Sequence, residues 1–228
     1  MEVELRINGV IASLDVAANE SLLFALRKEG YFSVKHGCGT GDCGACTVLV
    51  DGVPRSACVT FAAQVGGCTL TTVEGIGSAR GQHGLHPLQA AFSDTGAVGC
   101  GFCTPGMLLS SYALLKRNLN PTEEDVRDAL SGHLCRCIGY HKPVQAVLKA
   151  AAIMRREVEN AATSSPEPQT ALPGESTRKI DAVKLVSGKA AFADDIELRG
   201  MLYGRLLTSP HAHAVIREID VSEARALP

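Results

Sequence analysis

Nine cysteines are the residues of this sequence whose type and spacing could support metal chemistry. One group has the spacing C-x4-C-x2-C-x11-C and consists of Cys38, Cys43, Cys46 and Cys58. A second group has the spacing C-x2-C-x31-C-x-C and consists of Cys100, Cys103, Cys135 and Cys137. Four thiolates brought to one place bind either an iron–sulfur cluster or a zinc ion.

The first group has the C-x4-C-x2-C spacing that is typical of plant-type [2Fe–2S] proteins. Its loop also contains four glycines, Gly37, Gly39, Gly41 and Gly44. Glycine permits backbone angles closed to other residues, and it lets N–H groups approach the sulfurs. A four-cysteine zinc site usually has two separated C-x2-C pairs, whereas this group has three of its cysteines in a single loop. The first group therefore predicts a [2Fe–2S] cluster.

In the second group, each cysteine pair lies beside the end of a predicted helix. Two such loops can meet across a helical bundle, where helix N-termini would offset the charge of four thiolates. The spacing alone leaves three hypotheses: an iron–sulfur cluster, a zinc site and two reactive dithiols. Cys68 belongs to neither group and is interpreted as a small apolar side chain near a strand.

The first cysteine group lies among short elements of mixed type. Alternating apolar and polar residues predict strands over 3–7 and 10–16, joined by the turn Asn8-Gly9. A helix capped by Asn19 or Ser21 is expected to run through Lys28. Further strands are predicted over 47–50, 53–59 and 69–73. This order indicates a β-grasp layout.

From about His86 the pattern becomes helical, which predicts an all-α second domain. Helices are expected over 107–116, after the N-cap Thr122, and from Pro143 to about Glu159. Residues 161–176 have the composition of a linker. Beyond it, strands are predicted over 201–207 and 215–221.

Composition and charge exclude several other functions. The 228 residues are 46% hydrophobic and carry a formal net charge of −2, so neither nucleic acid nor a membrane surface is an expected partner. The N-terminus has no apolar run typical of a signal peptide or membrane span. We therefore expect a cytoplasmic location, where cysteines bind metal more often than they form disulfides.

Four motifs resemble the iron–sulfur component of molybdenum hydroxylases, the family of xanthine dehydrogenase, aldehyde oxidoreductase and aerobic carbon monoxide dehydrogenase. They cover residues 37–48, 85–89, 100–107 and 134–140, in that order. Four later stretches, 178–182, 186–190, 201–204 and 209–214, look like the start of the family's large molybdenum subunit. The chain is thus interpreted as the iron–sulfur part fused to the start of the molybdenum part. It would be a fragment of a longer protein, a truncated gene product or a deliberately shortened piece, and the sequence does not choose among these.

The resemblance implies an α+β chain with two cluster-binding domains. It implies a ferredoxin-like β-grasp domain over 1–77 and a four-helix domain over 84–159, each with one [2Fe–2S] cluster. A linker over 160–177 and an incomplete α/β hammerhead-type domain over 178–228 follow. Cys137 is expected to touch the pterin of a molybdenum cofactor. Gly99 stands where family members often have a glutamine that also touches it.

The function implied is electron transfer. Electrons would pass singly from a molybdopterin centre through two [2Fe–2S] clusters to FAD or another acceptor, and molybdopterin and FAD would be carried by partner subunits or missing segments. No catalytic residue is assigned to the chain, which would lack the substrate-oxidising site. The alternatives are a zinc-binding structural adaptor and a diffusible ferredoxin. The helical domain and the stretches after the linker argue against a ferredoxin.

Overall fold

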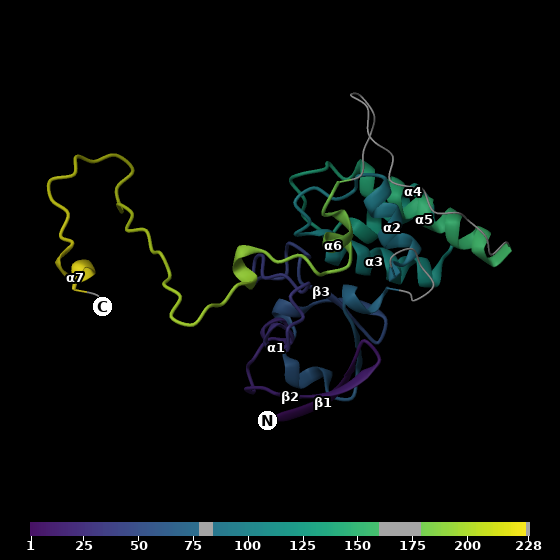
Figure 1. The fold of residues 1–228 in the computed structure, drawn as a ribbon, viewed down its shortest axis with the longest axis horizontal. Coiled ribbons are helices and arrows are strands. Elements are labelled where there is room, and N and C mark those ends of the chain that lie inside the picture. The colour runs from purple at the N-terminus through teal and green to yellow at the C-terminus, as the bar shows by residue number, and fades with distance from the viewer. Residues whose placement is uncertain (78–83, 160–178, 227–228) are drawn as a thin grey trace. The chain divides into compact units, whose positions relative to one another are not determined.

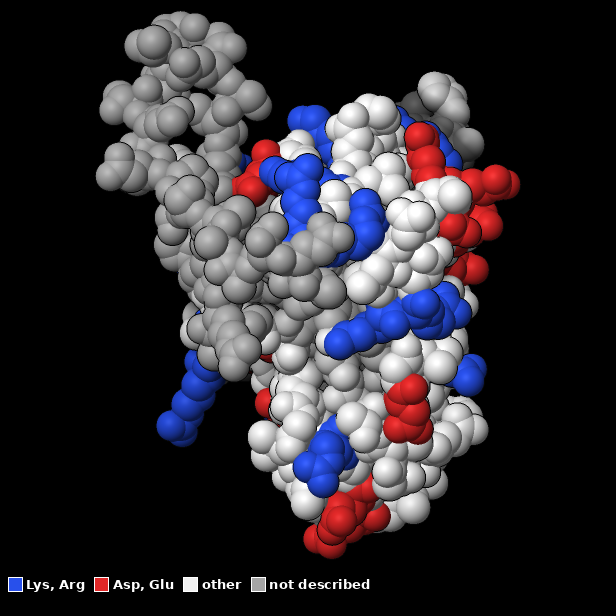
Figure 2. Space-filling view, turned by 90° about the vertical axis from the view of Figure 1, so that its right-hand side faces the viewer, with Lys and Arg blue, Asp and Glu red and all other residues white. Residues whose placement is uncertain are grey.

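The computed structural model describes residues 1–77, 84–159 and 179–226. The chain divides into two compact units, Met1–Ile196 and Glu197–Pro228. None of the helices in the described ranges is long and apolar enough to cross a membrane. Basic and acidic side chains are interspersed on the face shown in Figure 2.

The first unit begins with a five-stranded sheet of order β2-β1-β5-β3-β4 (Figure 1). Its strands are β1 (Glu2–Ile7), β2 (Val10–Asp15), β3 (Thr47–Val50), β4 (Val53–Ser56) and β5 (Thr69–Thr71). β1 and β5 are parallel, and the other pairs are antiparallel. Every second side chain of β1 is buried, which agrees with the alternation of apolar and polar residues from which the sequence predicted a strand.

Helix α1 (Leu22–Lys28) completes this first domain. The hydroxyl of its N-cap Ser21 accepts a hydrogen bond from the N–H of Phe24, as expected for the start of a helix. Leu22, Leu23 and Leu26 of the helix are buried in one hydrophobic core with β1, β3 and β5. The predicted β-grasp layout is thereby confirmed.

Four helices form the second domain: α2 (Pro87–Asp94), α3 (Thr104–Arg117), α4 (Glu123–Leu130) and α5 (His141–Glu159). Their apolar faces share a core that includes Phe92, Met107 and Val147. Thr122 caps α4, as the sequence predicted, and the structure adds a reciprocal capping box with Asp125. α3 begins earlier than predicted, and α5 begins before Pro143 rather than at it.

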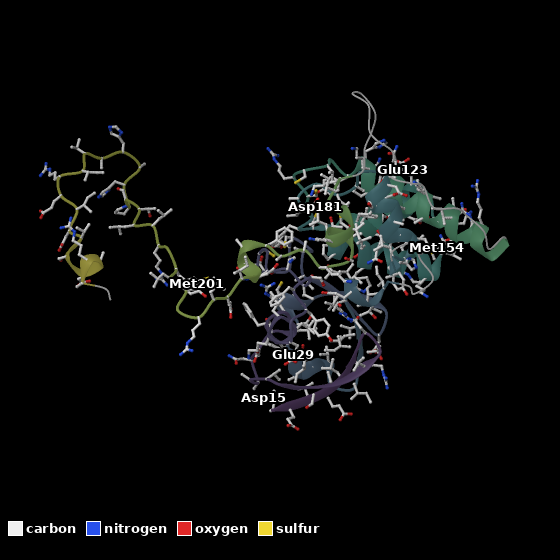
Figure 3. All side chains as sticks on the ribbon, viewed as in Figure 1. Asp15, Glu29, Glu123, Met154, Asp181 and Met201 are labelled. Atoms are coloured by element: carbon white, nitrogen blue, oxygen red, sulfur yellow. The ribbon has the colours of Figure 1, made fainter. Side chains whose placement is uncertain are left out.

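A short segment after the undescribed residues returns to these domains. It contains α6 (Ala182–Val186) and a 3-10 turn, η5 (Ala193–Asp195). Ala182, Leu185 and Val186 are buried, and α6 packs against α2 and α3. Figure 3 labels Asp181, the N-cap residue of α6, beside the helical domain.

The predicted strands over 201–207 and 215–221 are wrong for this structure. The second unit has one short helix in its described residues, α7 (Ser222–Arg225), and no strand. Leu206, Leu207 and Val215 are 94%, 91% and 85% exposed. A strand requires a hydrogen-bonded neighbour and a surface that covers its apolar side chains, and residues 197–226 provide neither. The predicted linker over 161–176 lies outside the described residues.

Candidate metal centres

The first cysteine loop lies between α1 and β3 and depends on glycine for its shape. Gly39, Gly41 and Gly44 have φ angles of +73°, +88° and +68°, in the left-handed region that favours glycine. A Cβ atom at Gly37 would lie 2.7 Å from the sulfur of Cys43. The loop can therefore gather its sulfurs only because no side chain stands at these positions.

This loop brings the four cysteines of the first group together as two pairs. The thiols of Cys38 and Cys43 lie close enough to influence each other's pKa, and the thiol of Cys58 lies close enough to that of Cys46 to influence the pKa of Cys46. Cys43 and Cys46 also interact, which joins the two pairs. The N–H groups of Thr40 and Cys58 donate to the sulfurs of Cys38 and Cys46, each at 3.4 Å. Backbone N–H groups of this kind stabilise negative charge on sulfur.

The second group is also arranged as two pairs, at the junction of α3 with the loop between α4 and α5. Cys100 contacts Cys137, and Cys103 contacts Cys135. Cys135 also interacts with Cys137 and, electrostatically, with Cys100, which joins the pairs. The structure thus gathers both cysteine groups that the sequence defined.

Gly99 has a structural role in the second group. A Cβ atom at this position would lie 2.5 Å from the Cβ of Cys137. Any larger side chain at residue 99 would have to displace Cys137. The glycine is therefore matched to the position of this cysteine in the present chain.

Each group combines a shielded and an exposed sulfur. Burial raises the pKa of Cys46 to about 12 and also raises that of Cys103. Exposed Cys38 has its pKa lowered to about 5, first by a hydrogen bond to Thr40. The pKa of Cys137, also exposed, is lowered by hydrogen bonds to Cys100. Both sites thus have one protected side and one side open to a partner.

These donor sets fit a binuclear cluster. In a [2Fe–2S] cluster held by four cysteines, each iron takes two thiolates, whereas a zinc site gathers four sulfurs around one ion. In each group the four cysteines lie as two neighbouring pairs, an arrangement that suits two irons. Within the described ranges, no group of three or more His, Cys, Asp or Glu side chains is placed to hold a single metal ion.

Cys68 lies apart from both groups. It precedes β5 and its side chain interacts with Asp51. Burial is the main cause that raises the pKa of its thiol. This placement agrees with the interpretation of Cys68 as a packing residue.

The two cysteine loops contact each other directly. The N–H of Leu134 donates to the carbonyl of Cys43 at 3.0 Å, so a residue adjacent to Cys135 is bonded to the first group. His133 is buried at this junction, against Gly44, and shares a 2.7 Å hydrogen bond with Ser110. Burial lowers the pKa of His133 to about 4, so its ring is neutral near pH 7. No local pattern in the sequence indicated this contact.

Two groups of four cysteines, one on a β-grasp domain and one on a helical domain, are the arrangement expected of an iron–sulfur protein of electron transfer. Models of a 2Fe-2S iron-sulfur cluster binding domain and of a [2Fe-2S] binding domain match residues 5–65 and 72–148. The nicotinate dehydrogenase small FeS subunit of Eubacterium barkeri is 45% identical over 141 residues, which are 61% of this chain and 88% of that protein. The chain belongs to the iron–sulfur components of the xanthine dehydrogenase and aldehyde oxidoreductase family.

The likeness continues beyond the two cluster domains. A model of the aldehyde oxidase and xanthine dehydrogenase a/b hammerhead domain matches residues 187–228. The aldehyde oxidoreductase of Megalodesulfovibrio gigas is 37% identical over 98% of this chain and 25% of that protein. The structure of aldehyde oxidoreductase from Desulfovibrio desulfuricans matches with a TM-score of 0.76 and 43% identity, over 85% of this chain and 22% of that one. The chain thus spans about a quarter of these longer relatives.

Proposed function

We propose that this chain receives electrons from a molybdenum–pterin centre at its helical domain and passes them, through its ferredoxin-like domain, to FAD or another acceptor. The observation that carries the proposal is the pair of cysteine groups, each with at least one exposed cysteine and joined at a common junction. A [2Fe–2S] cluster accepts one electron at a time, so two of them in series divide the pair that a hydroxylation releases.

The proposed ligands are the two cysteine groups in full. Cys38, Cys43, Cys46 and Cys58 would hold one cluster, and Cys100, Cys103, Cys135 and Cys137 the other. The protein's own contribution is to shield Cys46 and Cys103, to donate N–H groups to sulfur and to keep the two loops in contact.

The pterin would contact the helical domain at its exposed cysteines. Cys100 and Cys137 are both exposed, so a cofactor carried elsewhere can approach them. With Gly99 in place of a side chain, the pterin contact would rest on Cys137. The proposed partners are a molybdenum subunit or domain and an FAD-binding subunit or other acceptor, in the cytoplasm. The proposed domains are 1–77 and 84–159, with a linker over 160–177 and the molybdenum part from 178.

Reconstitution with a partner tests this division of labour. The cluster-loaded chain is mixed with a molybdenum subunit of the family and that subunit's substrate under anaerobic conditions, and the visible absorption is followed. We expect substrate to bleach the absorption only when the molybdenum subunit is present. Bleaching by substrate with this chain alone would contradict the proposal, and so would a partner that turns over its substrate with another acceptor but never reduces this chain.

A further inference from the structure

The buried carboxylate of Asp195 joins residues 179–196 to the ferredoxin-like domain. Asp195, in η5, accepts a hydrogen bond from Lys35 Nζ at 2.7 Å and one from Arg27 at 2.9 Å. The side chains of Lys35 and Asp195 are both 2% exposed, and that of Arg27 is 11% exposed. The backbone N–H of Phe192 also donates to Asp195, at 2.9 Å. The carboxylate is thus held by two cations that come from a distant part of the sequence.

An aromatic contact reaches the second domain from the same segment. The ring of Phe192 lies edge-on to that of Phe102, with centroids 5.5 Å apart, and Lys35 Nζ lies 4.3 Å above the Phe192 ring. Phe102 stands between Cys100 and Cys103, and it lies 3.7 Å from where a Cβ of Gly37 would be. Phe192 therefore contacts residues of both domains, beside both cysteine loops.

Helix α6 occupies a fitted surface on the helical domain. A Cβ at Gly101 would lie 2.3 Å from Leu185, so the backbone of the second cysteine loop touches this leucine directly. Buried Gln89 donates to the carbonyl of Val186 at 2.8 Å. Gly188, with a φ of +76°, packs closely against Val73 and Ser33.

We propose that residues 179–196, here called the strap, are a docking element of the iron–sulfur part, and that the two cluster domains together form a specific binding site for it. The site has an apolar surface for Leu185, an aromatic contact for Phe192 and a cationic socket, Lys35 and Arg27, for Asp195. The site recognises a segment with a short apolar helix followed by Phe-x-x-Asp.

The socket makes this binding selective. A buried charge that loses its partner is strongly unfavourable, whereas an exposed ion pair contributes little. Without Asp195, Lys35 would remain buried without its ion pair and would keep only the longer-range attraction of Glu74 among its described interactions. The two cations therefore favour a strap that brings one carboxylate to this point, and the contact should persist when the peptide link to the rest of the chain is cut.

The test uses the full chain with a protease recognition sequence inserted within residues 160–178. After loading with iron and sulfide and cleavage, the two pieces are followed by gel filtration in native buffer. We expect them to migrate together and to separate only in denaturant. Immediate separation of the wild-type pieces would overturn the proposal. This result does not depend on the direction of electron flow.

Two substitutions test which contact holds the strap. Asp195→Asn should make the cleaved piece dissociate at least about tenfold faster, because it removes the carboxylate that forms the buried ion pair with Lys35. Asp194→Asn is the matched control, since Asp194 is 59% exposed and lies 3.5 Å from Arg27, and it should leave release unchanged. Equal release from both variants would contradict the socket.

Phe192→Ala gives a second, independent measurement if Asp195→Asn fails to fold. It removes the contacts with Phe102 and Lys35 and should also speed release. Ile196→Ala, at a residue that is 47% exposed, is its control and should behave as wild type. Unchanged release for Phe192→Ala would overturn the proposed site.

Discussion

Cys43 and Cys103 each belong to one cysteine group only, so they separate the two proposed clusters. We expect Cys43→Ser to abolish the paramagnetic signal of the ferredoxin-like site in the reduced protein and to keep the other. Cys103→Ser should do the reverse. The physical reason is that a serine hydroxyl is a poor substitute for an iron-bound thiolate. The measurement is electron paramagnetic resonance of the reduced, folded variants.

Cys68→Ser is the control for both substitutions. Because Cys68 interacts with Asp51 rather than with either cysteine group, both signals should remain. Loss of both signals from a folded Cys43 or Cys103 variant would show that the groups are not independent. Loss of either signal in Cys68→Ser would show that the ligands are assigned wrongly.

Gly44 allows the two cysteine loops to approach. A Cβ there would lie 2.4 Å from the carbonyl oxygen of Gly132 and 2.5 Å from His133 Nδ1, at a φ of +68°. We expect Gly44→Ala to lower the free energy of unfolding by about 2–4 kcal/mol, from backbone strain and overpacking together. Gly52→Ala is the control, since Gly52 has a φ of +80° but nothing within 4 Å.

The thermal midpoints of the two alanine variants measure the contact between the loops. The thermal midpoint of Gly44→Ala should be well below that of Gly52→Ala, because Gly52→Ala introduces only the backbone strain of a positive φ and no close contact. Equal midpoints would mean that the contact with Gly132 and His133 contributes nothing.

At the residue scale, the sequence showed the first cysteine group through the short spacing of its loop, and it joined the two distant halves of the second group through the family resemblance. The sequence identified Gly37 and Gly44 as loop residues. It did not show which neighbouring atoms come so close to them that a side chain would not fit. The pairing of Lys35 with Asp195 could not be predicted, because 160 residues separate the two and neither lies in a motif. The contact of Leu134 with Cys43 joins two domains and was hidden for the same reason.

At the scale of elements, helix α2 is expected to respond to acid. His86 is its N-cap, and His86 Nδ1 accepts a hydrogen bond from the N–H of Leu88 at 3.2 Å. Burial, with a smaller contribution from Lys116, lowers the pKa of His86 from 6.5 to about 4. Protonation would place a hydrogen on the accepting nitrogen and remove the cap.

The unfolded chain therefore binds a proton at His86 more readily than the folded chain does. The contribution of neutral His86 to the free energy of unfolding is complete above pH 6.5. It is lost as the pH falls toward 4, by on the order of 2 kcal/mol. His86→Asn keeps a capping side chain but does not titrate, so its thermal midpoint should fall less than that of wild type between pH 7 and pH 5. Identical pH dependence in the two proteins would contradict this role of His86.

Elements with local signals were predicted well, and those that need distant partners were not. Ser21 and Thr122 mark the starts of α1 and α4 by side-chain caps that operate within a few residues. The stretches 201–207 and 215–221 have apolar residues in a strand-like pattern, but a pattern does not provide a neighbouring strand. Helix α6 was missed because it is only five residues long and is fixed by packing on α2 and α3.

At the scale of the whole molecule, the account rests on two clusters in one chain. Two [2Fe–2S]-binding domains predict four iron and four acid-labile sulfide per chain. The most direct test is to load the protein anaerobically, assay iron, sulfide and zinc, and integrate the paramagnetic signals after chemical reduction. The account predicts this stoichiometry, little zinc, and two distinct signals that sum to about two spins per chain. Tightly held zinc with little sulfide, or a single signal that integrates to about one spin, would contradict it.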